Sequence, residues 1–122
     1  MKIAIPMEEK SINSSISVTF GRAPYFLIYD ADTEEEVYIA NPAAAAQGGA
    51  GIKAAQTVID AGVEAVLLPR LGQNAAEIFK AGKIALYKAE FGSVKHNLDL
   101  WKNNKLAALT EFHSGFHGRG GR

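Results

Sequence analysis

The sequence feature that most constrains the fold is a short apolar run between two helical patterns. Residues 64–68 read EAVLL, which is typical of a strand buried on both faces of a parallel sheet. Before it, apolar residues recur at helical spacing from Ile52, and Gly62 is suited to end that helix. After it, residues 72–82 predict a second helix and residues 83–87 another strand. Right-handed crossovers between such strands place helices on the faces of the sheet.

The first part of the chain predicts an antiparallel hairpin added to this unit. Residues 2–6 form an apolar strand that Pro6 should end, and residues 25–29 and 36–40 flank a turn rich in acids. Ser93 is suited to cap a third helix that reaches Lys102. We therefore expect an α/β fold of order β-β-β-α-β-α-β-α, in which a five-stranded mixed sheet carries helices on its faces.

Size and composition narrow the function classes. With 122 residues, 48% of them hydrophobic, we expect one domain over residues 1–110 and a flexible Gly/His/Arg tail over residues 111–122. The 13 basic and 13 acidic residues balance, which disfavours a nucleic-acid partner. The chain has no cysteine, so thiolate ligands and thiol nucleophiles are excluded. No apolar run approaches the roughly 20 residues of a membrane helix, and the N-terminus is too strand-like for a signal peptide, so we expect cytoplasmic residence.

The loop over residues 7–24 is the first candidate for function. A connection of this length in a small domain is more often a binding loop than a simple link. It ends in TFGRAPYF, which delivers Arg22 just before a strand. The starts of the two later helices, near Gly51 and residues 72–74, should meet it at one sheet edge. The alternative for Arg22 is a structural pairing with Glu8, Glu9 or a C-terminal carbonyl group.

Residues 49–54 match the relaxed dinucleotide motif G-x-G-x-x-A, but the context differs from that of a dinucleotide domain. Residues 41–48 separate the motif from the preceding strand, and the region of Arg70 replaces the expected acid. A plain glycine-rich helix entry explains the motif. The alternative is an enzyme or sensor that binds a phosphorylated small molecule or nucleotide at the helix starts.

Two further groups of side chains suggest weaker sites. The acids of residues 30–36 surround one hairpin tip, so a solvated turn is expected rather than a two-metal nuclease. His113 and His117 have the spacing of a metal-binding pair, although the intervening residues disfavour a helix. Together with the RGGR end, they leave open an interaction module whose tail binds metal or RNA.

Several of these segments, in this order, resemble the dinitrogenase iron–molybdenum cofactor family, as a small stand-alone member. The resemblance is carried by KIAIP at residues 2–6, FGRAPYF at 20–26, NP at 41–42, GAG at 49–51, GQNA at 72–75 and GKI at 82–84. It implies a ribonuclease-H-like fold of five strands and three helices. It also implies non-enzymatic binding or carriage of an iron–molybdenum or iron–sulfur cofactor or its precursor, here without cysteine ligands.

The expected ligand is thus a small anion or metal cluster held between the loop and the glycine turn. Arg22 would contact the anion, Asn41 and Asn74 would orient it, and the amides of Gly49 and Gly51 would donate to it. Phe20 and Gly21 belong to the signature that the family shares. Many relatives carry histidine at the position of Thr19 and just before the glycine turn, where this chain has Gln47. The predicted cofactor-binding residues are therefore Thr19, Phe20, Gly21, Arg22, Asn41, Gln47, Gly49, Gly51 and Asn74.

Overall fold

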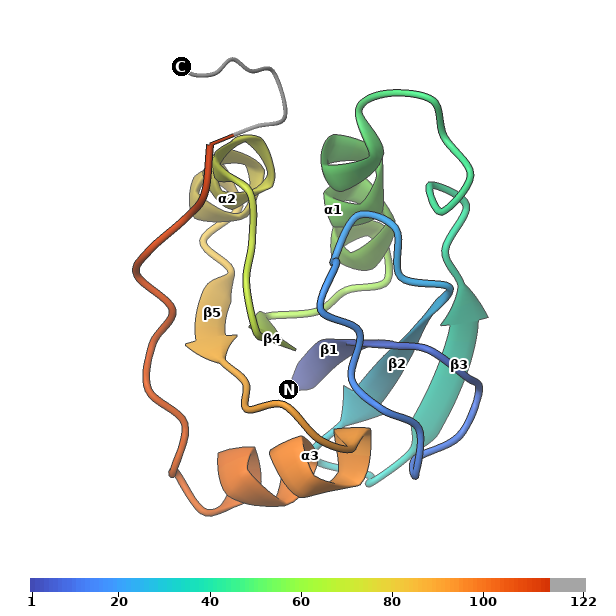
Figure 1. Cartoon of the computed structure of the whole chain (residues 1–122). Helices are drawn as coiled ribbons and strands as arrows, with labels where there is room; N and C mark the ends of the chain where they lie inside the picture. Colours follow the sequence, from blue (N-terminus) through green and yellow to red (C-terminus); the bar gives the residue numbers. More distant parts are fainter. Residues whose placement is uncertain (115–122) are drawn as a thin grey trace.

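Five strands form one mixed sheet, and the strand that begins the chain lies at its centre (Figure 1). The computed structural model describes residues 1–114. In chain order the elements are β1 (Lys2–Met7), β2 (Tyr25–Asp30), β3 (Glu36–Ala40), α1 (Ala50–Asp60), β4 (Ala65–Leu68), α2 (Gln73–Ala81), β5 (Ala85–Lys88) and α3 (Val94–Lys102). The sheet order is β3-β2-β1-β4-β5, which confirms the predicted α/β layout. Within residues 1–114, no helix is long and apolar enough to cross a membrane.

The two halves of the sheet differ in strand direction. β2 pairs antiparallel with both β1 and β3, so the predicted hairpin is present. β4 pairs parallel with β1 and with β5, as the two crossover helices require. The carboxyl ends of β4 and β1 therefore point to the same edge. The name ribonuclease-H-like stays a prediction for this layout.

Each face of the sheet has its own apolar core because side chains alternate along a strand. Ala4 and Val66 pack in the cluster that α1 and α2 cover, whereas Ile5 and Leu67 pack in the cluster on the α3 side. Figure 1 shows α1 and α2 on one face and α3 on the other. β4 is fully buried along its length, as its apolar run predicts.

Several predicted strand boundaries differ from the structure by one or two residues, and two of these differences have a clear physical reason. Pro6 does not end the first strand: it pairs with Phe26, and β1 continues to Met7. The carbonyl oxygen of Pro6 accepts a hydrogen bond from Ser17, so the side of the residue that lacks an N–H faces the loop and not β2. β5 begins at Ala85 rather than at residue 83, because Lys83 has a positive φ of 60° in the turn after α2.

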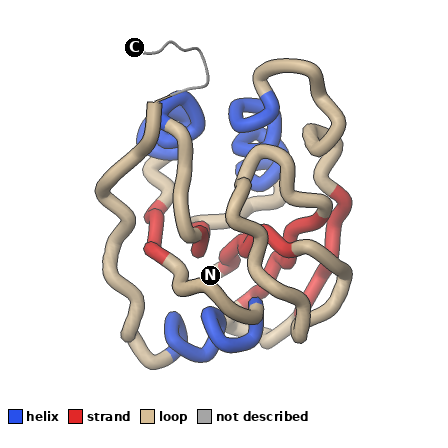
Figure 2. Tube along the Cα trace, viewed as in Figure 1, coloured by secondary structure: helices blue, strands red, loops and turns tan. Residues whose placement is uncertain are grey.

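The loop over residues 8–24 is tied to the body of the protein at two places, one in its middle and one near its end. The backbone N–H of Ile16 donates to Gly92, and that of Val94 donates to Ser14, which joins the loop to the start of α3. Further on, the ring of Phe20 is buried, 5.2 Å from the Phe26 ring between centroids, and packs on the α1 and α2 side. Figure 2 shows that this loop runs from beside α3 up toward the start of α1, where residues 41–49 also rise above the sheet.

Gly21 brings this loop into backbone contact with the start of α1. A Cβ atom at Gly21 would lie 2.8 Å from the nitrogen of Gly51, so only glycine permits this approach. Behind it, the buried Asn41 side chain donates to the carbonyl oxygens of Gly21 and Ala23, at 3.0 and 2.8 Å. The loop is therefore fixed against α1 from two sides.

The segment after α3 covers the outer edge of the sheet at β5. We call residues 105–114 the C-terminal strap, which runs from α3 to α2 (orange to red in Figure 1). It pairs with the free edge of β5: Lys88 N–H donates to Ala107, and Leu109 N–H donates to Leu86. The predicted domain boundary at residue 110 stays a prediction, and residues 115–122 of the predicted tail lie outside the described residues.

Replacing Gly21 with alanine tests the backbone contact with α1. The new Cβ must push the loop away from Gly51, and we expect the free energy of unfolding to fall by about 1–3 kcal/mol. Gly48→Ala is the matched control, because a Cβ there meets no atom within 4 Å. It should change stability by less than about 1 kcal/mol. Urea unfolding followed by circular dichroism measures both variants, and equal stability of the two would contradict the contact.

Candidate functional site

A cavity of about 700 Å³ opens where the two crossover helices begin. It is lined by the end of the loop, the entry to α1, the entry to α2 and one residue of the C-terminal strap. The lining residues are Val18, Thr19, Phe20, Gly21, Arg22, Gln47, Gly48, Gly49, Ala50, Gly51, Ile52, Arg70, Leu71, Gly72, Asn74, Ala75 and His113. Segments far apart in the sequence thus meet at one edge of the sheet, as expected for an open α/β fold.

The helix starts leave backbone N–H groups free at this cavity. The first N–H groups of a helix have no partner within the helix itself. Within residues 1–114, no acceptor takes the N–H of three residues of α1 and two of α2. These are Ala50, Gly51, Ile52, Asn74 and Ala75, and all five residues line the cavity. Together with the two helix dipoles they favour a negatively charged group.

Glycines at the α1 entry leave this approach open. Gly49 precedes the helix with a φ of 66° in the left-handed region, which glycine adopts without strain. Neither Gly48 nor Gly49 would bring a Cβ within 4 Å of other atoms, and Gly51 would meet only the Ala75 side chain at 3.6 Å. The cavity side of this turn is therefore bare backbone.

Arg22 is held in place by carbonyl groups and not by acids. Its Nη1 atom donates to Ala46 at 2.6 Å and to Ala44 at 3.2 Å, in the segment before α1. The alternative pairing with Glu8 or Glu9 is absent from the described residues. The other N–H groups of the guanidinium remain as donors for a ligand.

Arg70 adds a second guanidinium to the lining, and no acid accompanies the two. It follows β4 directly at the sheet edge and is exposed. None of the lining residues is Asp or Glu, although the chain as a whole is neutral. The cavity is thus a positively charged region on a protein without net charge. The sequence analysis considered Arg70 only as a contact for a dinucleotide. Its position just after a buried parallel strand could have predicted that it lines a ligand site, because such sites lie beyond the carboxyl ends of the strands.

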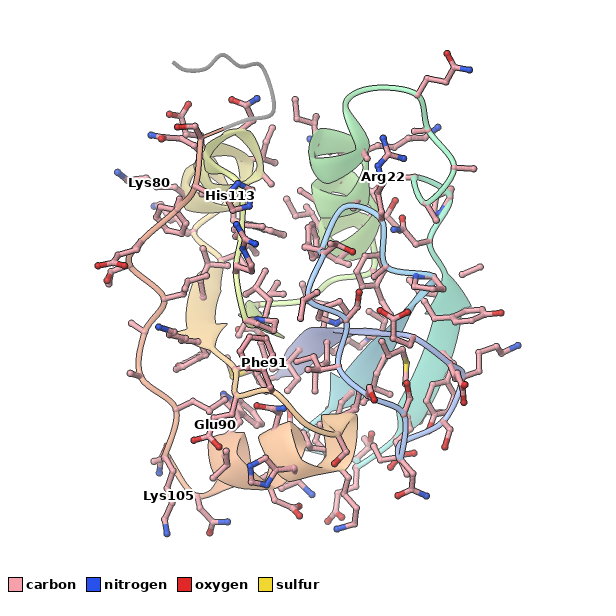
Figure 3. All side chains as sticks on the ribbon, in the orientation of Figure 1. Arg22, Lys80, Glu90, Phe91, Lys105 and His113 are labelled. Atoms are coloured by element: carbon pink, nitrogen blue, oxygen red, sulfur yellow. The ribbon has the colours of Figure 1, made fainter. Side chains whose placement is uncertain are left out.

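His113 lines the same cavity from the C-terminal strap. Its backbone N–H donates to Leu71, and its carbonyl oxygen accepts from Gln73, at 3.2 and 2.9 Å. The predicted partner, His117, lies outside the described residues. Figure 3 shows His113 beside α2 and Arg22 beside α1. Sequence reasoning assigned His113 to a flexible tail and missed its contact with this site.

Most of the predicted cofactor-binding residues come together here. Eight of them line the cavity: Thr19, Phe20, Gly21, Arg22, Gln47, Gly49, Gly51 and Asn74. Asn41 does not, because its side chain lies behind the loop, where it donates to backbone carbonyls and accepts from Ala43. Phe20 forms the apolar floor and anchors the loop.

The other motifs do not form sites within residues 1–114. The Asp30 carboxylate at the hairpin accepts from the backbone N–H of Asp32 and Thr33, and these bonds, the Asp32 bond first, lower its pKa below the ordinary value. No group of three or more His, Cys, Asp or Glu in this part of the chain is arranged to hold a metal ion. The G-x-G motif starts α1, which follows the antiparallel edge strand β3 through residues 41–49, unlike the strand–turn–helix of a dinucleotide domain.

Known proteins share the fold of this chain and are similar to it over most of its sequence. An uncharacterised protein of Methanocaldococcus jannaschii is 31% identical over 109 residues, which are 87% of this chain and 89% of that protein. A Thermotoga protein provisionally described as NifB, solved by NMR, is 34% identical with a TM-score of 0.81 over 98% of both chains. The apo form of the orange protein from Desulfovibrio gigas is 25% identical, with a TM-score of 0.84 over 89% of this chain and 92% of its own.

The family match covers nearly all of the folded part. The family described as dinitrogenase iron-molybdenum cofactor matches residues 1–104, from the start of the chain to just beyond α3. The matched region includes every lining residue of the cavity except His113. This chain belongs to the dinitrogenase iron–molybdenum cofactor family.

Proposed function

We propose that this protein binds and carries a small anionic ligand in the cavity at the starts of α1 and α2. By its family, the ligand is an iron–molybdenum or iron–sulfur cofactor or a precursor of one. The observation that carries the proposal is the lining formed by residues 1–114: five backbone N–H groups without an acceptor and two arginines, with no acid among them. Each of these groups donates hydrogen bonds to negative charge.

The size and the strength of the site suit such a ligand. A cavity of about 700 Å³ is within the usual range for small-molecule and cofactor sites. Each helix start contributes about 0.3–1 kcal/mol toward an anion, and each charge-assisted arginine contact contributes roughly 1.5–3 kcal/mol. Binding therefore depends on several modest contacts, with the arginines as the largest.

The lining favours a preassembled metal complex over a bare metal ion. No thiolate is available in a chain without cysteine, and no carboxylate of residues 1–114 lines the cavity. A bare ion would lack most of its coordination sphere here. An anionic cluster that brings its own inorganic ligands needs only hydrogen-bond donors and few coordinating atoms, and the cavity supplies these.

Binding and carriage, rather than catalysis, is part of this proposal. The described lining consists mainly of N–H donors, which suit the binding of an anion. Cytoplasmic residence and the lack of a nucleic-acid partner likewise stay predictions from the sequence.

Removing the arginines should weaken the binding of a cluster. The probe is isolated iron–molybdenum cofactor, titrated anaerobically into the protein and followed by visible absorbance and by metal analysis after gel filtration. We expect Arg22→Ala and Arg70→Ala each to weaken binding roughly 10- to 100-fold, because each loses a charge-assisted contact. Arg70→Ala is the cleaner test, since Arg22 also holds the segment before α1.

Lys105→Ala is the matched control for this experiment. It also removes one positive charge, but Figure 3 shows Lys105 near α3, at the end of the molecule away from the cavity. Its affinity should equal that of the original chain at physiological salt, because exposed charges this far from a ligand are screened. A cofactor that fails to bind, or that binds both arginine variants as tightly as the control, would reject the proposal.

The free N–H groups at the glycine-rich start of α1 also favour a second candidate, a phosphorylated small molecule or nucleotide. A thermal-unfolding panel of nucleotides and sugar phosphates tests it. A true ligand at 100 times its dissociation constant should stabilise the fold by about 2.7 kcal/mol. Gly51→Ala, which places a methyl group at the helix entry, should reduce that shift. No shift with any compound of the panel would remove this candidate.

A further inference from the structure

His113 is fixed at the cavity by its backbone, although it comes from the end of the described chain. Its N–H and carbonyl groups bond to Leu71 and Gln73, the residues on either side of Gly72. Leu109 is buried and Phe112 packs against the core, so the strap is anchored just before His113. The backbone bonds of His113 and the apolar packing of the strap, rather than contacts of the imidazole itself, therefore hold the ring at the cavity.

The imidazole ring of His113 packs against Gly72, which has no side chain. A Cβ atom at Gly72 would lie 3.2 Å from Cε1 of His113, which is closer than most Cβ contacts, and 3.7 Å from Nε2, which is ordinary van der Waals contact. The ring therefore occupies the space that a larger residue at the α2 entry would fill. Asn74 and Ala75, whose N–H groups have no acceptor among the described residues, line the same cavity.

The hydrogen bond of the ring defines which nitrogen can bind a metal. Nδ1 lies 3.1 Å from the carbonyl oxygen of Ser114. A carbonyl oxygen only accepts, so Nδ1 carries the proton, and the lone pair of the neutral ring is on Nε2. Metal-binding histidines usually donate their other N–H in this way, which fixes the ring and raises its basicity.

We infer that Nε2 of His113 coordinates a metal atom of the cluster in this cavity. The inference rests on the proposed function and names one residue for it. The guanidinium groups and backbone N–H groups at the cavity are donors without a free lone pair, so they can hold the anionic surface of a cluster but cannot bind its metal. The side chains of Thr19, Gln47 and Asn74 offer only oxygen atoms, which suit harder cations than the iron of a metal–sulfur cluster. Neutral imidazole is a good ligand for iron and similar metals. Among the described residues, His113 is the one histidine of the lining, and it lies beyond the residues that the family match covers.

The test uses the full-length protein with its histidines labelled with ¹⁵N, loaded anaerobically with isolated iron–molybdenum cofactor in a paramagnetic state. Pulsed EPR should detect one coupled histidine nitrogen. In His113→Ala this coupling should vanish and binding should weaken about tenfold or more. Added imidazole should restore a nitrogen coupling, unlabelled in this case. The fold should be retained, because the bonds to Leu71 and Gln73 use the backbone of residue 113.

His96→Ala is the matched control, because His96 is exposed and its ring contacts Glu90 at 3.0 Å, beside α3. It should leave coupling and affinity unchanged. If the cofactor binds but shows no histidine coupling, or if the coupling is lost in His117→Ala and kept in His113→Ala, the inference is wrong and the proposed function stands. If the unaltered protein binds no cofactor, both fail together.

Discussion

The candidate site depends on a backbone contact that only glycine permits. Because Gly21 has no Cβ, the loop over residues 8–24 meets the start of α1 at Gly51 and forms one wall of the cavity. Asn41 holds this wall from behind through two donated bonds, and Phe20 anchors it below in the core. Without this contact, the α1 entry would still expose its N–H groups, but Arg22 would not be fixed beside them.

The distribution of charge gives the site its character. The chain is neutral overall, with 13 residues of each sign, yet the part of the cavity lining that the structure describes has two arginines and no acid. Acids gather instead at the turn between β2 and β3, where backbone N–H groups bond to the Asp30 carboxylate. Concave surfaces of one sign focus the electrostatic field, so a neutral protein can still attract an anion to one place.

Most of the fold, and the meeting of the distant loops, could be predicted from the sequence. Apolar periodicity identified each strand and helix, and the rule for parallel sheets placed the starts of α1 and α2 at one edge. What failed has a common physical reason. The role of Pro6 depended on which side of β1 its carbonyl faces, and Asn41 bonds to a loop remote in sequence. Backbone bonds of this kind leave no pattern in side chains, so the position of His113 beside Gly72 could not be predicted either.

The C-terminal strap connects the stability of the fold to the site. It covers the edge of β5, which would otherwise expose unpaired N–H and carbonyl groups. The same strap then caps the first N–H of α2, at Gln73, through the carbonyl of His113. Docking of the strap therefore completes both the sheet and the cavity wall. If a ligand in the proposed site contacts His113, its binding stabilises the docked position of the strap. By linkage, docking of the strap strengthens ligand binding by the same free energy.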